Sequence, residues 1–108
     1  MLNDEIRYRI LKALEQSPSM SQRDLAAHLG VSLGKANYCL KELMKMGLIK
    51  AGKFSSNSDK RIYAYLLTPK GVKEKAVVTL RFLERKIDEY EQIKEEIARL
   101  KTEVQQTE

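Results

Sequence analysis

The segment SLGKANYCLKELMKM, residues 32–46, combines basic, amide and small side chains with a strong apolar pattern. At 100° per residue of an α-helix, the apolar side chains of Ala36, Cys39, Leu40 and Leu43 fall on one face. The opposite face and its flanks hold the side chains that can bind a ligand. These candidates, together with the serine before the helix, are Ser32, Gly34, Lys35, Asn37, Tyr38, Lys41 and Lys45.

Each of these residue types suits the major groove of DNA. Lysines neutralise phosphates or reach guanine edges, Asn37 can pair with an adenine edge, and Tyr38 can contact a phosphate or a thymine methyl group. Gly34 would let the start of the helix approach the DNA backbone closely, and a Ser32 cap leaves backbone N–H groups near a phosphate. The alternative is that the lysines form an ordinary solvated face, as on any surface helix.

Residue sets for catalysis or metal binding are absent from the sequence. It has no paired nucleophile and base, no glycine-rich phosphate loop and no Cys/His cluster. His28 is the only histidine, and Cys39, the only cysteine, is expected to be a small buried hydrophobe rather than a redox sensor. We therefore expect no enzymatic activity, no cofactor and no metal ion.

Three short helices and a hairpin are expected to position the candidate residues. Helices are predicted at residues 3–17, from Ser21 to about residue 29, and from Ser32 to Met46. Ser21 and Asp24 have the spacing of a capping box, and Gly30 and Gly47 are natural helix stops. Residues 48–54 and 60–67 are β-prone and flank the polar loop 55–59, which predicts a two-stranded wing.

The wing would carry three further candidate DNA-binding residues. Lys53, Lys60 and Arg61 lie around its polar tip, where an arginine can enter a narrow minor groove. The fold class that follows is mainly α, formally α+β: a winged helix-turn-helix followed by a long C-terminal coiled-coil-like helix.

A last helix is predicted from Thr68-Pro69 to about residue 105. Apolar residues recur along it at spacings of three and four, with one extra three-residue step that overwinds the pattern locally. The predicted dimerisation seam starts near Ala76 and comprises Leu80, Leu83, Ile87, Tyr90, Ile93, Ile97, Leu100 and Val104. A lone helix would leave this seam in water, so a homodimer is expected. The spacing leaves open whether the two helices pair parallel or antiparallel.

Charge is distributed unevenly over the 108 residues. Residues 1–69 hold 11 Lys and Arg against 6 Asp and Glu, whereas residues 70–108 hold 9 of each. The net charge of +5 thus belongs wholly to the first part, which favours a polyanionic partner there. We predict a DNA-binding domain at residues 1–69 and a dimerisation helix at residues 70–108.

The compartment is expected to be the cytoplasm. A single cysteine allows no intrachain disulfide, which fits a reducing environment. The start of the chain lacks the pattern of a signal peptide, and no stretch approaches the ~20 apolar residues that span a bilayer. No membrane partner is therefore expected.

Residues 8–50 and the stretch SDKRIYAYLLTPKGVKEKA resemble the MarR family of bacterial winged-helix transcriptional regulators. The family's wing pattern is met by Asp59, Arg61, Leu67, Thr68 and Gly71. By this resemblance Arg61 would read the minor groove with Asp59 orienting it, and the helix 32–45 would be the recognition helix. The strings SQRDLAAHLGVSLGKANYCLKEL and TLRFLERKIDEYEQIKEEI resemble more closely the small subgroup linked to exopolysaccharide (EPS) gene clusters.

One departure from the family bears on regulation. MarR proteins usually carry an additional N-terminal helix that builds the dimer and a ligand pocket, whereas this sequence begins almost at the first helix of the DNA-binding unit. The resemblance therefore does not carry over small-molecule sensing, and no effector is assigned. Dimerisation would then depend on the C-terminal helix.

Three hypotheses for the function follow. The first is a homodimeric, sequence-specific transcriptional regulator that binds double-stranded DNA and controls polysaccharide biosynthesis genes. The second is a winged-helix protein-interaction module with a coiled-coil arm that binds a partner; the basic excess of residues 21–61 disfavours it. The third, regulation by a ligand in the dimer crevice, has no mark in the sequence. The operator and the sign of regulation stay open.

Overall fold

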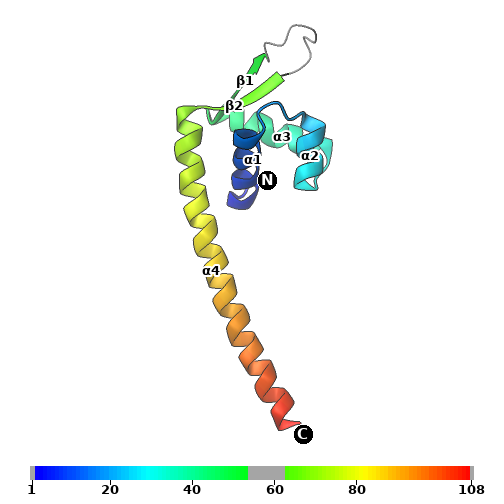
Figure 1. Ribbon diagram of the computed structural model, residues 1–108, viewed down its shortest axis with the longest axis vertical. Coiled ribbons are helices and arrows are strands. Elements are labelled where there is room, and N and C mark those ends of the chain that lie inside the picture. The colour runs from blue at the N-terminus through cyan, green and yellow to red at the C-terminus, as the bar shows by residue number, and fades with distance from the viewer. Residues whose placement is uncertain (1, 54–62, 108) are drawn as a thin grey trace.

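The computed structural model describes residues 2–53 and 63–107 of the chain (Figure 1). Its elements are α1 (Asp4–Gln16), α2 (Gln22–Leu29), α3 (Leu33–Lys45), β1 (Ile49–Lys53), β2 (Tyr63–Leu67) and α4 (Pro69–Gln106). The predicted fold class is confirmed: three helices and a two-stranded wing form a winged helix, which a long C-terminal helix follows.

Local caps set the ends of the three short helices. The Asn3 side chain accepts a hydrogen bond from the Ile6 N–H at 2.8 Å, and Ser21 and Asp24 form the predicted capping box. Gly30 and Gly47 have φ values of 70° and 74°, the left-handed conformation that stops a helix at little cost only for glycine. These caps fix the lengths of α1, α2 and α3.

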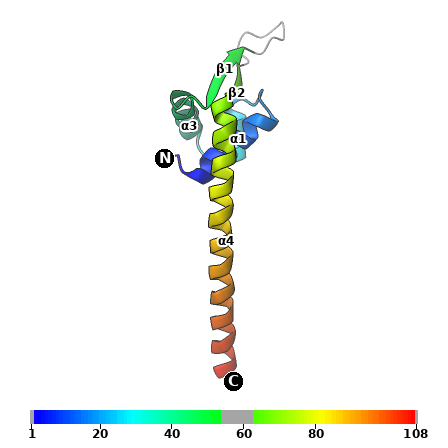
Figure 2. The ribbon, with the colours of Figure 1, turned by 90° about the vertical axis from the view of Figure 1, so that its left-hand side faces the viewer.

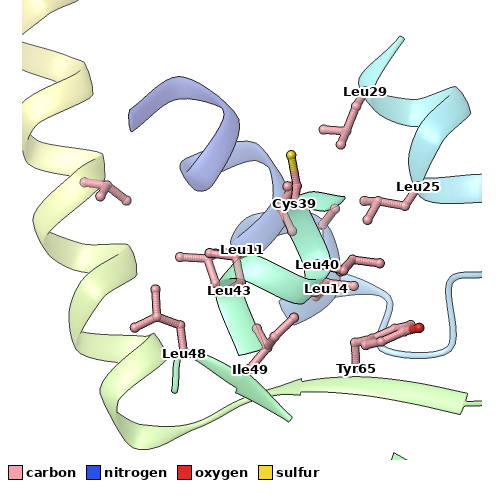
Figure 3. Close-up of a cluster of buried hydrophobic side chains, with 13 residues drawn as sticks. Leu11, Leu14, Leu25, Leu29, Cys39, Leu40, Leu43, Leu48, Ile49 and Tyr65 are labelled. Carbon is pink, nitrogen blue, oxygen red and sulfur yellow. The ribbon is translucent and has the colours of Figure 1, made fainter. Parts of the chain in front are cut away.

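One apolar core lies between α1, α2, α3 and the wing (Figure 3). Leu11 and Leu14 of α1 contribute to it with Leu40 and Leu43 of α3, all at 1% exposure or less. The sulfur of Cys39 belongs to the same core, as predicted. Burial of the inner face of α3 leaves its other face in solvent.

The wing is an antiparallel pair whose register runs from Ile49 opposite Leu67 to Lys53 opposite Tyr63. Tyr65 fixes the wing to the helical body, because its N–H donates to the Pro18 carbonyl at 3.1 Å and its hydroxyl accepts from Gln22 at 2.9 Å. The predicted strands 48–54 and 60–67 are therefore confirmed over the described residues. The polar loop 55–59 lies outside them.

Helix α4 gives the molecule its elongated shape, with extents of 71 × 25 × 22 Å (Figure 2). At 1.5 Å per residue its 38 residues span about 57 Å. Only its first turns lie beside the helical body, and the remainder projects away from it (Figure 1). Within the described ranges, no helix is long and apolar enough to cross a membrane.

The start of α4 packs on α1. Val78 is fully buried in the core, and the rings of Tyr8 and Phe82 stack with centroids 5.3 Å apart. An ion pair at 3.0 Å joins Arg7 Nη1 to Glu74 Oε1 beside them. Helix α4 is thus packed on the winged helix at one end, and its other end projects into solvent.

Candidate DNA interface

The outer face of α3 brings the predicted DNA-binding residues together. Ala36, Cys39, Leu40 and Leu43 are buried, as the helical wheel predicts. On the opposite side, exposed residues follow one another at spacings of four, three and four. This stripe along the helix consists of Gly34, Tyr38, Lys41 and Lys45. Lys35 is exposed beside the stripe, and Asn37 is half-buried at its edge.

The electrostatics of this face are dominated by its lysines. Lys45 lies 3.4 Å from Glu42, an exposed intrahelical pair of little energetic weight. Lys35 and Lys41 have no acidic partner among the residues that the structure describes. Because the face has no further acidic residue, it presents a net positive charge to any partner that approaches α3.

The N-terminus of α3 is built for close approach. The Ser32 side chain accepts a hydrogen bond from the Lys35 N–H at 3.1 Å, which leaves other first-turn N–H groups pointing outward. A Cβ added to Gly34 would meet no atom within 4 Å. Neither packing nor a positive φ explains this glycine, which is the less stable choice in a helix. An external surface that approaches the helix closely would explain it.

The wing residues are described only in part. The backbone of Lys53 ends β1, whereas Lys60, Arg61 and Asp59 lie outside the described residues. Their predicted contacts with a minor groove stay predictions. The described strands β1 and β2 extend beyond the helical body (Figure 1).

Thr68 and Gly71 join α4 to the base of the wing, a role that the sequence pattern did not predict. The Thr68 N–H donates to the Leu48 carbonyl at 3.0 Å, and its hydroxyl donates to the Gly47 carbonyl at 2.6 Å. A Cβ on Gly71 would lie 2.0 Å from the Leu48 oxygen, so only glycine fits. Two of the five residues of the wing pattern, Thr68 and Gly71, therefore help to fix the direction of α4, and the glycine two residues after Pro69 was the available signal.

The predicted seam residues lie along the free part of α4 with their side chains in solvent. Leu80, Leu83, Ile87 and Tyr90 are 51–59% exposed, and the four that follow are 46–62% exposed: Ile93, Ile97, Leu100 and Val104. Sequence reasoning missed the aromatic contact of Phe82 with Tyr8, which occupies the other side of the same helix.

Comparison with known proteins agrees with this geometry. Residues 3–50 match the family model described as winged helix-turn-helix DNA-binding. No curated protein matches the chain. Solved structures with the same fold include the transcriptional regulator BldR from Sulfolobus solfataricus, at 27% identity and a TM-score of 0.64. The transcriptional repressor CouR, bound to a 23-mer DNA duplex, is 26% identical with a TM-score of 0.64.

A third similar structure is a MarR-family transcriptional regulator from Rhodococcus sp. RHA1, at 19% identity and a TM-score of 0.56. The matches cover 77%, 77% and 70% of this chain but only 59%, 57% and 52% of BldR, CouR and the Rhodococcus protein. The chain thus spans little more than half the length of these relatives. Residues 3–50 are thus similar to winged helix-turn-helix DNA-binding domains, and the structural neighbours are described as transcriptional regulators, one of them from the MarR family.

Proposed function

We propose that the chain is a homodimeric, sequence-specific DNA-binding transcriptional regulator. Helix α3 enters the major groove, and the 55–61 loop lies over an adjacent minor groove, with Lys60 and Arg61 in the loop and Lys53 at the end of β1 before it. Helix α4 joins two copies so that they read two half-sites about one helical turn, or ~34 Å, apart. The seam on α4 would form the dimer, and the basic charge of residues 1–69 would attract the DNA to both copies.

The observation that carries this proposal is the outer stripe of α3. Lys41 and Lys45 share the exposed stripe with Gly34. No contact within the described fold requires a glycine at position 34. Lysines on a solvated helix are ordinary, but a glycine that weakens the helix at the same exposed stripe is not. A DNA backbone close to the helix start would use both features.

The exposed seam supports the dimer. A folded monomer of 12.5 kDa is expected to expose about 6,200 Å², whereas this chain exposes 7870 Å². Its eight seam residues on α4 are all about half exposed. Pairing two copies along this seam would remove these apolar side chains from water.

Charge reversal at Lys41 tests the proposal. Lys41→Glu should weaken binding to a DNA motif selected from random sequences by at least tenfold, since it replaces an attraction to phosphate by a repulsion. Fluorescence anisotropy at fixed salt measures the affinity. Lys12→Glu, an equal charge change on the exposed side of α1, is the matched control and should have a much smaller effect. Equal affinities for both variants and the unmodified protein would contradict DNA binding through α3.

The regulated genes are the finer part of the proposal. The strings SQRDLAAHLGVSLGKANYCLKEL and TLRFLERKIDEYEQIKEEI resemble the EPS-associated MarR subgroup, which suggests control of polysaccharide biosynthesis genes. This part depends on the resemblance alone. Chromatin immunoprecipitation with the protein at its native level would test it, and sites confined to unrelated genes would contradict it.

A further inference from the structure

Every residue of α4 from Leu83 onward that the structure describes is exposed. Arg85 still reaches the body, because its Nη2 lies 3.7 Å from Asp4 Oδ2, but the seam residues beyond it have no apolar partner within the described chain. We propose that a second copy of α4 covers the seam in parallel and in register, so that each seam residue meets its own counterpart. This inference deepens the dimer of the proposed function, on which it rests, by assigning its direction and its specificity-determining charges.

Heptad positions support a parallel pair. Up to Tyr90, Leu80 and Ile87 occupy a, and Leu83 occupies d. After the three-residue step at Tyr90, Ile97 and Val104 occupy a, and Leu100 occupies d. The β-branched residues therefore lie mainly at a and leucines mainly at d, the combination that favours two-stranded parallel coiled coils. Leu80 and Ile93 are the two exceptions.

The seam spacing alone would also fit an antiparallel pair centred on Tyr90, because the steps are the same in both directions from it. The flanking charges separate the two arrangements. In a parallel pair each g residue meets the e residue five positions later on the partner helix. The charged g–e pairs with both residues inside α4 are then of opposite sign: Lys86 with Glu91, Glu89 with Lys94, and Glu96 with Lys101.

An antiparallel pair is less complementary. It places g opposite g and e opposite e, which still matches Lys86 with Glu96 and Glu84 with Lys94. At the two-fold axis, however, Glu89 would face Glu89 of the other copy, and Glu91 would face Glu91. Two like-charge contacts at the centre of the interface oppose this arrangement.

Two exposed valines of α4 add an independent argument. Val72 and Val77 are 53% and 48% exposed and do not belong to the seam. In the heptad of Leu80 and Ile87 they occupy g and e, five residues apart, so a parallel pair brings them into contact. An antiparallel pair would place Val77 opposite Lys101 and leave Val72 beyond Gln106, the last helical residue of the partner.

The winged-helix bodies permit parallel pairing. Glu74, Val78 and Phe82 face α1, whereas Ala76, Leu80 and Leu83 lie on the other side of the helix. Two copies joined along the seam would therefore carry their bodies outward, at the same end of the rod. In Figure 2 the distal half of α4 projects without any neighbouring element, so nothing in the described chain obstructs a second helix there.

Cysteine cross-linking of the full chain in a Cys39→Ala background tests the direction. In a parallel pair, Leu100→Cys lies beside its counterpart and Leu80→Cys beside its own, so each variant should cross-link with itself under oxidised glutathione. A mixture of the two, distinguished by tag length, should give no mixed product. In an antiparallel pair each residue 100 lies opposite residue 80, about 30 Å from its counterpart. Only the mixed product would then form, and that result overturns the proposal.

Charge exchange gives a second, non-covalent test. Glu96→Lys creates like-charge contacts with Lys101 and should weaken the dimer about fivefold. Adding Lys101→Glu should restore the dissociation constant in a parallel pair. In an antiparallel pair the double variant stays weak, because the lysine introduced at position 96 would still face Lys86 of the other copy. Gln92→Lys on the opposite side of the helix is the control.

These results are distinguishable from failure of the proposed function. A protein that is monomeric by sedimentation and forms neither cross-link overturns the pairing of α4, whatever its DNA binding. If Leu100→Cys cross-links with itself but the protein binds no DNA in anisotropy, the parallel dimer is supported and the proposed function as a DNA-binding regulator is contradicted.

Discussion

Gly34 is the residue that most directly connects the fold to the proposed contact with DNA. It lies in the first turn of α3, on the exposed stripe, where an added methyl group would meet no atom of the described chain within 4 Å. Alanine is the better helix former by up to about 1 kcal/mol in a helix interior. The fold alone would therefore favour alanine at this position.

Gly34→Ala should separate stability from binding. We expect the free energy of unfolding to rise by about 0.5 kcal/mol and Tm by about 2–4 °C, because the helix gains a better former. We also expect affinity for the selected DNA to fall about tenfold, since the methyl group would hold the backbone away. Circular dichroism and anisotropy measure the two quantities. An alanine variant that binds DNA as tightly as the unmodified protein would show that nothing approaches α3 closely at this point.

At the scale of elements, the orientation of α4 depends on a few contacts at its first turn. The Thr68 side chain caps the helix through the Gly71 N–H at 3.0 Å, and Lys70 Nζ donates to the Met46 carbonyl at 3.0 Å. Gly71 lies against the Leu48 backbone, which cannot move without disturbing the start of β1. The wing, the end of α3 and α4 therefore form one rigid joint.

Gly71→Ala should disrupt that joint. The added Cβ would overlap the Leu48 oxygen, and overpacking of this kind costs about 1–3 kcal/mol. We expect Tm to fall by about 10 °C in a thermal melt followed by circular dichroism. Lys73→Ala, an exposed position two residues further along α4, should leave Tm within a few degrees. A Gly71→Ala variant as stable as the unmodified protein would contradict this account of the joint.

Signals confined to a few residues predicted these elements well. The caps at Ser21 and Ser32, and the helix stops at Gly30 and Gly47, depend on neighbours within one turn, so the sequence reveals them. Contacts between distant segments could not be predicted in this way. The stacking of Tyr8 on Phe82 and the approach of Gly71 to Leu48 depend on how α4 lies on the body. Sequence spacing alone does not define that orientation.

The same limit applies to the candidate site. The helical period placed Lys41 and Lys45 on the outer face of α3 correctly, because the apolar residues of one helix define its buried side. The predicted roles of Lys60 and Arg61 concern the tip of the wing, whose residues lie outside the described ranges. Substitution of Lys60 and Arg61 would test these roles. The structure itself describes only the strands β1 and β2 of the wing.

At the scale of the whole molecule, charge and shape divide between two ends. The excess charge of +5 lies in residues 1–69, and the neutral remainder forms most of a rod that carries the exposed seam. If both subunits contact phosphates, the salt dependence of DNA binding by the dimer should be about twice that of a single subunit. The logarithm of the affinity falls with the logarithm of the salt concentration by about 0.9 per phosphate neutralised.

Ile97→Glu should therefore convert the protein into a monomer and halve that salt dependence. Ile97 is 46% exposed and lies far along α4 from the winged helix, so a charge there should break the seam while the DNA-binding body stays folded. Loss of the linked second half-site should weaken binding to a palindromic site about a hundredfold or more, because each body would then bind alone. Sedimentation would report the monomer, and anisotropy over a series of salt concentrations the slope. Gln92→Glu, an equal charge change on the opposite side of the helix, should stay dimeric and bind normally. A monomeric Ile97→Glu variant with the full affinity and the full slope would mean that one winged helix makes all the DNA contacts without the dimer.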